Sequence, residues 1–147
     1  MNIAIASDHG GYLLKTTVKE YLIQNGYEVT DFGCDSLDSC DYPDYGVPAA
    51  RAVADQTCDM GIVICTTGIG ISMAANKVHG IRCALCSDPL SAGLTRQHNN
   101  ANMLALGAGI IGPNQALEIV DTFLHTPFQG GRHQRRVDKI MAVEENP

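Results

Sequence analysis

Five short apolar runs, each followed by a segment with helical periodicity, repeat along the 147 residues of this chain. Runs of this length between glycine- and proline-containing turns are typical of buried strands. Strands that alternate with helices form a parallel sheet with helices on both faces, because each connection crosses over the sheet. The sequence therefore predicts an α/β fold. Strands are expected at 2–7, 27–32, 60–65, 81–86 and 103–106, and helices at 11–25, 46–56, 69–78, 88–98, from 113 onward and, as a basic C-terminal helix, at about 131–143.

We expect one domain, residues 1–147, with the doubly wound (Rossmann/flavodoxin-like) strand order 2-1-3-4-5. In this order the chain switches direction between the first and third strands, and ligands bind beyond the C-terminal ends of those strands. The segments at these two ends are SDHGG (Ser7–Gly11) and CTTGIG (Cys65–Gly70). The sequence thus predicts the functional site where these two segments meet.

Composition and charge argue against several classes of binding partner. The formal net charge of −6 argues against a nucleic-acid partner. No apolar run approaches the roughly 20 residues that span a bilayer, and the N-terminus lacks the features of a signal peptide. We therefore expect a cytoplasmic protein without a membrane partner, whose six cysteines are free thiols. Cys83 and Cys86 lie three apart on a predicted strand and face opposite sides, so no metal site is expected.

The stretch VICTTGIGIS, residues 63–72, places a thiol at the start of a glycine-containing turn that leads into a helix. Unpaired N–H groups at a helix N-terminus bind anions, and glycines let a ligand approach the backbone. The turn 66–70 is therefore either a plain connection or an oxyanion cradle. Cys65 is either a buried small hydrophobic residue or a reactive thiol, and its place at the switch point favours neither reading over the other.

Other polar residues also allow two interpretations. Asp8 and His9 follow the first strand, where the carboxylate can cap the next helix as well as serve a ligand. The His-Asn-Asn run at 98–100 fits a helix C-cap, but its density of polar groups also fits a ligand site. Tyr42 and Asp44 lie in a loop and fit turn positions equally well.

The segment FQGGRHQRRVDKI, residues 128–140, holds four of the ten basic residues. Arg132 and Arg136 are four apart and share a helix face, whereas Arg135 and Lys139 share another. Such a segment is usually a solvated face, but paired guanidinium groups on an acidic chain also suit a phosphate. Together with the thiol, the cradle and the carboxylate, it fits proton abstraction next to a carbonyl of a small phosphorylated substrate.

These segments, taken in order, resemble one family along essentially the whole chain. The sequence is similar to the type B ribose-5-phosphate isomerases, within a wider sugar-phosphate isomerase family that includes allose-6-phosphate and galactose-6-phosphate isomerases. The matching motifs are SDHGG, DYPDYG (41–46), ICTTGIGISMAANK (64–77), GIRCAL (80–85), RQHNNAN (96–102) and GGRHQRRVDKI (130–140).

The resemblance implies an aldose–ketose isomerase that interconverts ribose 5-phosphate and ribulose 5-phosphate, a step of the pentose phosphate pathway. It implies that Cys65 is the base that moves a proton between C1 and C2 through a cis-enediolate. Thr67 and the following amides would hold the enediolate oxygen, Asp8 would serve the hydroxyl protons, and His98 would help to open the furanose ring. The substrate-binding residues that it implies are His9, Tyr42, Thr66, Gly68, Ile69, Gly70, Ser72, Asn99, Arg132 and Arg136, of which His9, Arg132 and Arg136 would bind phosphate.

The resemblance further implies a homodimer, which can associate into tetramers, with each site shared between two subunits. The segment that carries His98 would be lent to the site by the partner. The resemblance implies neither a metal nor a cofactor.

Two positions depart from the family pattern. Asn100 stands where the family usually has Asp, and Gly109, in LGAGIIG, stands where the family commonly has an Arg that helps to hold phosphate. These departures leave a six-carbon substrate such as allose 6-phosphate as an alternative. A non-catalytic phosphosugar-binding module is the alternative from another class, although binding alone does not need the thiol of Cys65.

Overall fold

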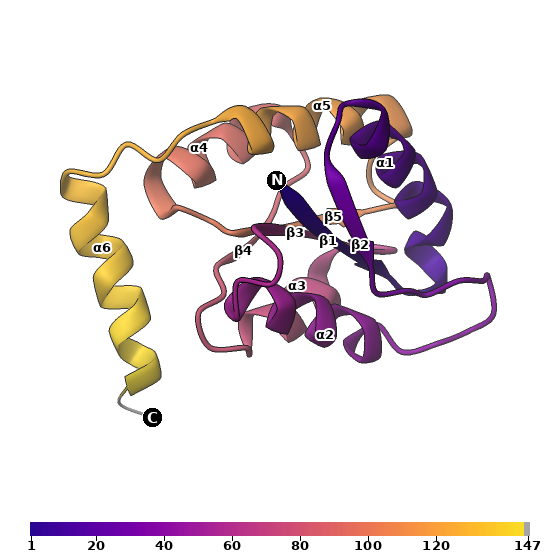
Figure 1. The fold of residues 1–147 in the computed structure, drawn as a ribbon, viewed down its shortest axis with the longest axis horizontal. Coiled ribbons are helices and arrows are strands. Elements are labelled where there is room, and N and C mark those ends of the chain that lie inside the picture. Colours follow the sequence, from indigo (N-terminus) through magenta and orange to yellow (C-terminus); the bar gives the residue numbers. More distant parts are fainter. Residues whose placement is uncertain (146–147) are drawn as a thin grey trace.

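The computed structural model describes residues 1–145; the last two residues of the expected domain, 146–147, lie outside the described residues. Within the described residues five strands alternate with five α-helices, a sixth α-helix follows the fifth, and there are two short 3-10 helices (Figure 1). The elements are β1 (Asn2–Ser7), η1 (His9–Gly11), α1 (Tyr12–Gln24), β2 (Glu28–Asp31), α2 (Pro43–Ala54), β3 (Met60–Cys65), α3 (Ile69–Asn76), β4 (Cys83–Leu85), α4 (Pro89–Asn99), β5 (Met103–Gly107), α5 (Pro113–His125), α6 (Arg132–Met141) and η2 (Ala142–Glu145).

The sheet is parallel throughout, as predicted, but its order is β2-β1-β3-β5-β4. The predicted order 2-1-3-4-5 is therefore wrong at its last two strands. β5 is buried along its whole length and pairs with both β3 and β4, whereas β4 has two half-buried residues and one exposed residue. A strand that is apolar on both faces is stabilised most at the centre of a sheet, so β5 takes the inner place and β4 the edge.

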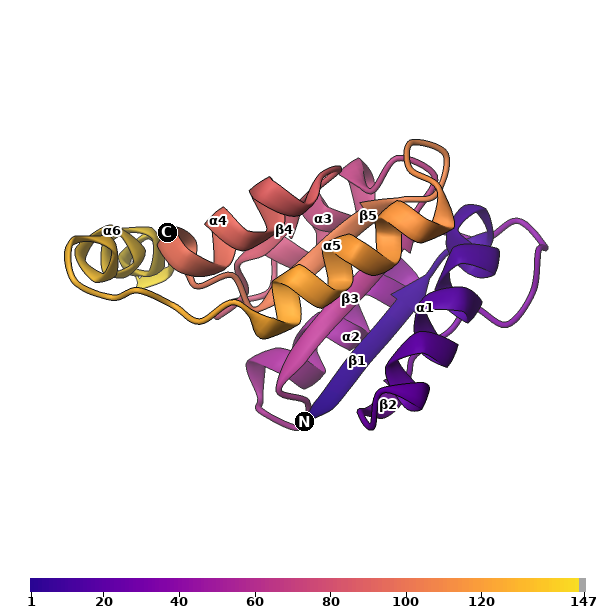
Figure 2. The same cartoon turned by 90° about the horizontal axis from the view of Figure 1, so that it is seen from above.

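Helices cover both faces of the sheet (Figures 1 and 2). Alternate strand residues face opposite layers: Ile3 and Ile5 pack with α1, α4 and α5, whereas Ala4 and Ala6 pack with α2 and α3. In the same way Cys86 packs in the first layer and Cys83 against the second, which confirms that the two sulfurs face opposite sides.

Helix boundaries differ from the expected ones by up to three residues. α2 begins at Pro43 rather than at residue 46, because proline suits the first helical position and Asp44 adds negative charge to the first turn. The C-terminal helix ends at Met141 and continues as η2.

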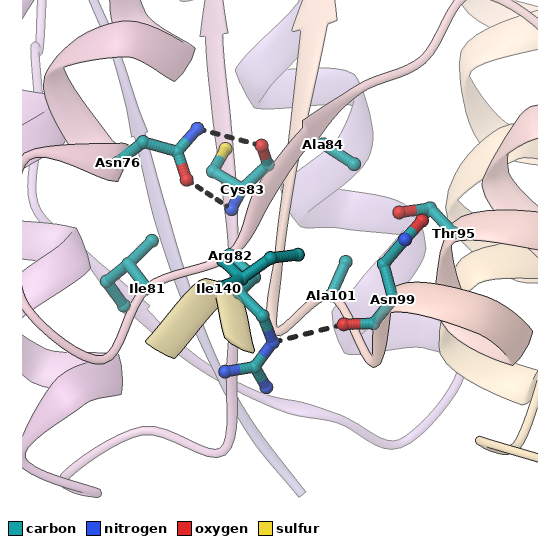
Figure 3. A pocket seen from close by; sticks show the side chains of 9 residues that line it. All are labelled: Asn76, Ile81, Arg82, Cys83, Ala84, Thr95, Asn99, Ala101 and Ile140. Atoms are coloured by element: carbon teal, nitrogen blue, oxygen red, sulfur yellow. Dashed lines mark hydrogen bonds between the residues drawn. The ribbon is translucent and has the colours of Figure 1, made fainter. Parts of the chain in front are cut away.

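At the β4 edge of the sheet, a side chain makes hydrogen bonds with the strand backbone. The carboxamide of Asn76 accepts the N–H of Cys83 over 2.8 Å and donates to the Cys83 carbonyl over 2.9 Å (Figure 3). It therefore takes the place that a neighbouring strand would occupy at this residue of β4. Beyond this edge α6 lies beside α4, outside the two helical layers (Figures 1 and 2).

Candidate active site

Cys65 is the last residue of β3, and its side chain is buried. Its Sγ accepts a hydrogen bond from the N–H of Gly68 over 3.1 Å. Gly68 has a φ of 75°, and a Cβ there would lie 2.5 Å from Leu85 Cδ1 and 2.8 Å from the carbonyl carbon of Leu106. Only glycine fits this backbone conformation and this space, so the turn holds the sulfur at the N-terminal end of α3.

Several backbone N–H groups of the turn after Cys65 and of the start of α3 are hydrogen-bonded within this segment. The Thr67 hydroxyl oxygen accepts the N–H of Ile69 over 3.2 Å, and the N–H of Ser72 donates to the Gly68 carbonyl over 3.2 Å. The Ser72 hydroxyl donates to the Ile69 carbonyl over 2.7 Å. Within the described residues, the N–H groups of Gly70 and Ile71 have no such partner, and they are the donors left for a ligand at this helix end.

The segment after β1 lies against this turn. Asp8 is buried, its N–H donates to the Ile64 carbonyl over 3.3 Å, and its Oδ1 accepts the N–H of Gly11 over 3.1 Å. Asp8 therefore caps the short 3-10 helix η1 directly before α1, whereas α1 itself, with Gly11 at its N-cap position, has no side-chain cap. A Cβ at Gly10 would overlap the Thr66 hydroxyl and lie 3.4 Å from Asp8 Oδ1. The Thr66 hydroxyl and the Asp8 carboxylate therefore both lie next to Gly10, beside the end of β3 that carries Cys65.

The loop between β2 and α2 covers the same region. The ring of Tyr42 lies on Gly70, where a Cβ would be 2.5 Å from Tyr42 Cζ. The N–H of Cys40 donates to His9 Nδ1 over 3.2 Å, and the Cys40 Sγ lies 4.0 Å from the same nitrogen. With Nδ1 as acceptor, the neutral ring carries its proton on Nε2, the nitrogen available to a ligand.

The remaining predicted residues lie elsewhere. α4 runs back along the sheet after β4, so its last residues, His98 and Asn99, lie at the opposite end from Cys65 (Figure 2). Arg132 and Arg136 are exposed on α6, next to α4. One chain therefore brings together the residues of β1, β3, α3 and the loop before α2, and it keeps His98, Asn99 and the two arginines apart from them.

Within this second group two histidine rings are stacked, a contact that was not predicted from the sequence. The rings of His98 and His133 are stacked, with centroids 4.3 Å apart and an interplanar angle of 11°. His133 is buried, and its pKa is lowered by that burial and by His98, Arg132 and Arg136. A signal existed in the sequence: His133 and Val137 are four apart, each directly after one of the two exposed arginines, and they form the inner face of α6.

A cavity of about 280 Å³ adjoins this second group. It is lined by residues of β4, α4 and α6 and of the segments beside them, among them Arg82, Asn99 and Ile140 (Figure 3). The guanidinium of Arg82 points to the carbonyl of Asn99, to which its Nε donates over 3.1 Å.

Residues 1–145 hold neither a metal-binding cluster nor a membrane-spanning helix. No group of three or more His, Cys, Asp or Glu side chains is placed to hold a metal ion in this part of the chain. No helix in it is both long and apolar enough to cross a membrane. All six cysteines are free.

Residues 3–140 match the family model of the ribose/galactose isomerases. The chain belongs to this family. Among its members, ribose-5-phosphate isomerase B of Escherichia coli strain K12 is 48% identical over 143 residues, which cover 97% of this chain and 96% of that protein.

Solved structures of the family agree in fold along the whole chain. Ribose-5-phosphate isomerase B of Clostridium thermocellum has a TM-score of 0.98 and 54% identity, with 99% of this chain and 98% of that chain covered. The enzyme of Mycoplasma genitalium, solved with bound ribulose 5-phosphate, has a TM-score of 0.96 and 44% identity, with 99% and 97% covered. The predicted resemblance to type B ribose-5-phosphate isomerases is thus confirmed.

Proposed function

We propose that residues 1–147 act as one catalytic domain in which Cys65 is the base of a sugar-phosphate isomerisation. The enzyme is an aldose–ketose isomerase that interconverts ribose 5-phosphate and ribulose 5-phosphate. The observation that carries the mechanism is the position of the Cys65 sulfur, 3.1 Å from the Gly68 N–H at the start of α3. There it lies beside the free N–H groups of the same helix end.

The reaction moves one proton between carbons and one between oxygens. The sulfur of Cys65 takes the proton from C2 of the open-chain aldose, and the electrons left behind form the C1–C2 double bond as negative charge moves to the C1 oxygen. Thr67 and the N–H groups of Gly70 and Ile71 stabilise this enediolate. Asp8 transfers the proton of the C2 hydroxyl to the C1 oxygen, and the thiol returns its proton to C1.

The substrate also needs ring opening and a phosphate site, and both come from the second group of residues. Within one subunit His98, Arg132 and Arg136 lie at the far end of the sheet from Cys65. We therefore propose a two-fold dimer in which each subunit lends these residues, with Asn99, to the Cys65 of the other. His9 and Tyr42 complete the pocket from the side of Cys65. Exposed apolar side chains on α3, β4 and α4 support an interface on this side of the molecule: Ile69, Met73, Leu85, Leu90 and Leu94.

A six-carbon substrate is the second candidate, and Gly109 is the observation that favours it. Gly109 is exposed and lies against Thr66, whose carbonyl accepts its N–H over 2.8 Å, so residue 109 does not itself fill the space that an arginine side chain would take. That space suits a phosphate one carbon further from the reacting end of the sugar.

The test is an isomerase assay with ribose 5-phosphate and allose 6-phosphate side by side. A higher kcat/KM for ribose 5-phosphate, lost in Cys65→Ala, supports the first proposal, and a higher value for allose 6-phosphate supports the second. Binding of both sugars without turnover would instead support a phosphosugar-binding module.

A further inference from the structure

The turn that follows α4 is held by a guanidinium from a distant part of the chain. Arg82 Nε donates to the carbonyls of Asn99 and Asn100, each over 3.1 Å, and its Nη2 donates to Asn100 over 2.8 Å (Figure 3 shows the bond to Asn99). The last carbonyls of a helix lack partners within the helix and carry partial negative charge. Arg82 therefore satisfies the helix end directly after His98.

The conformation of this turn depends on such support. Asn100 has φ 45° and ψ 44°, which is left-handed backbone. Its side-chain oxygen accepts a hydrogen bond from Arg96 Nη1 over 3.1 Å. Two guanidinium groups, one from α4 and one from the segment before β4, thus fix the direction in which the chain leaves His98.

The same arginine reaches the C-terminal end of α6. Arg82 Nη1 lies 3.2 Å from the Sδ of Met141, the last residue of that helix. Two residues before Arg82, the N–H of Gly80 donates to both carboxylate oxygens of Glu144, over 2.9 and 3.0 Å. The segment 80–82 therefore contacts both the end of α4 and the end of α6.

In the described part of the chain, the Arg82 guanidinium makes hydrogen bonds to backbone carbonyls rather than an ion pair. Among residues 1–145, no carboxylate lies within salt-bridge distance of it. Burial lowers its pKa, and the Glu144 carboxylate acts in the opposite direction. The partial charges of backbone carbonyls are thus the main counterpart of this half-buried cation.

We infer that Arg82 is a positioning residue, which holds His98 on α4 and the arginines of α6 as one rigid unit for the partner subunit's site. The inference rests on the proposed function, because it assumes the roles of His98, Arg132 and Arg136. Arg82 then sets the distance between His98 on α4 and the arginines of α6. The His98–His133 stack is the second contact that links the two helices. A ring-opening group and a phosphate clamp must hold a fixed distance, since a misplacement of about 1 Å costs on the order of 100-fold in rate.

The experiment begins with Arg82→Ala, with Arg51→Ala on the exposed face of α2 as the matched control. Arg82→Ala is expected to lower kcat/KM for ribose 5-phosphate by about 100-fold and to speed hydrogen exchange of the α6 amides. Arg51→Ala should leave both unchanged. Arg82→Lys keeps the charge without the planar fork and serves as the test variant should Arg82→Ala not fold as a dimer.

Subunit mixing separates positioning from a general loss of structure. In a mixed dimer of the Arg82 variant and Cys65→Ala, one site combines an intact Cys65 side with an intact lent unit. That mixture should regain activity, up to about a quarter of all sites at equal amounts. A mixture of the Arg82 variant with His98→Ala should not, because both lent units are then damaged.

Two outcomes overturn the inference. The first is an Arg82 variant with the kcat/KM and the hydrogen exchange of Arg51→Ala. The second is no recovery with Cys65→Ala, while Cys65→Ala and His98→Ala restore each other in a parallel mixture. If the mixture of Cys65→Ala with His98→Ala also stays inactive, the shared site proposed above is itself overturned. This parallel mixture therefore distinguishes a failure of the Arg82 inference from a failure of the shared site.

Discussion

The N–H of Gly68 donates a hydrogen bond to the Sγ of Cys65 over 3.1 Å, although the two residues belong to a turn and a strand end, respectively. The bond holds the sulfur at the N-terminal end of α3, where the helix dipole stabilises negative charge. Gly68, whose N–H makes this bond, has left-handed backbone with a φ of 75°.

If Cys65 is the base, its replacement should stop proton transfer but spare binding. Cys65→Ala is expected to lower kcat by about 1,000-fold or more, and Cys65→Ser by nearly as much, because a hydroxyl is a much weaker acid than a thiol. Titration calorimetry should still detect ribose 5-phosphate binding to both variants. Full turnover by Cys65→Ala would rule out the proposed base.

The shared site predicts recovery of activity between two inactive variants. Cys65→Ala and His98→Ala each damage a different side of every site, so a mixed dimer keeps one intact site of two. Differently tagged subunits should be exchanged, purified by both tags and assayed with ribose 5-phosphate. Purified mixed dimers that remain inactive would contradict a site built from two subunits.

Gly109→Arg should supply the phosphate contact that the family resemblance implies at this position. One charge-assisted hydrogen bond contributes about 1.5–3 kcal/mol, so KM for ribose 5-phosphate is expected to fall about tenfold or more. Turnover should change little, because phosphate binding is shared by ground and transition states. Steady-state kinetics of the variant and the wild type provide the measurement.

The structure permits this substitution at a small cost. Gly109 does not have a positive φ, and a Cβ there would lie 3.1 Å from both Cγ2 and the carbonyl oxygen of Thr66, so Thr66 must shift slightly. Gly109→Ala carries the same Cβ without the charge and isolates that effect. An equal or higher KM in a folded Gly109→Arg, relative to Gly109→Ala, would show that this position does not face the phosphate.

Lys15 should matter for stability far more than its neighbour Lys19. Lys15 is buried and donates to Asp31 Oδ1 and to the Cys34 carbonyl, each over 2.7 Å. Lys15→Met is therefore expected to lower the free energy of unfolding by about 3 kcal/mol. Lys19 is 38% exposed and contacts Asp31 over 2.9 Å, so Lys19→Met should cost less than about 1 kcal/mol. Urea unfolding at neutral pH compares the two, and equal losses would contradict the difference in burial.

His133 should contribute to acid sensitivity. Burial, together with His98, Arg132 and Arg136, lowers its pKa in the folded state. Below the unfolded value of about 6.5, the unfolded chain therefore binds more protons, and the free energy of unfolding falls as pH decreases toward the folded pKa. Between pH 7.5 and 5.5, His133→Asn should lose less stability in urea unfolding than the wild type. The exposed His79→Asn should behave like the wild type, and an unchanged pH dependence in His133→Asn would contradict this account.

Features that depend on local order along the chain were predictable from the sequence. The predicted strands at 2–7 and 60–65 coincide with β1 and β3, because each is a continuous apolar run that ends at a turn of polar and glycine residues. The position of Cys65 at a strand end therefore follows from the local pattern alone. Since both strands flank the switch point, the wrong order of the last two strands did not displace this half of the site.

Relations between segments that are distant in sequence were not predictable, because they depend on the assembled fold. Whether β4 or β5 lies beside β3 depends on the total burial of each strand in the assembled sheet, and no local pattern measures that burial. The stack of His98 on His133 and the bonds from Arg82 to the end of α4 likewise join residues that are not neighbours in the sequence. Local propensity fixes the elements that carry these groups, but the distances between the groups exist only once the helices have packed against the sheet.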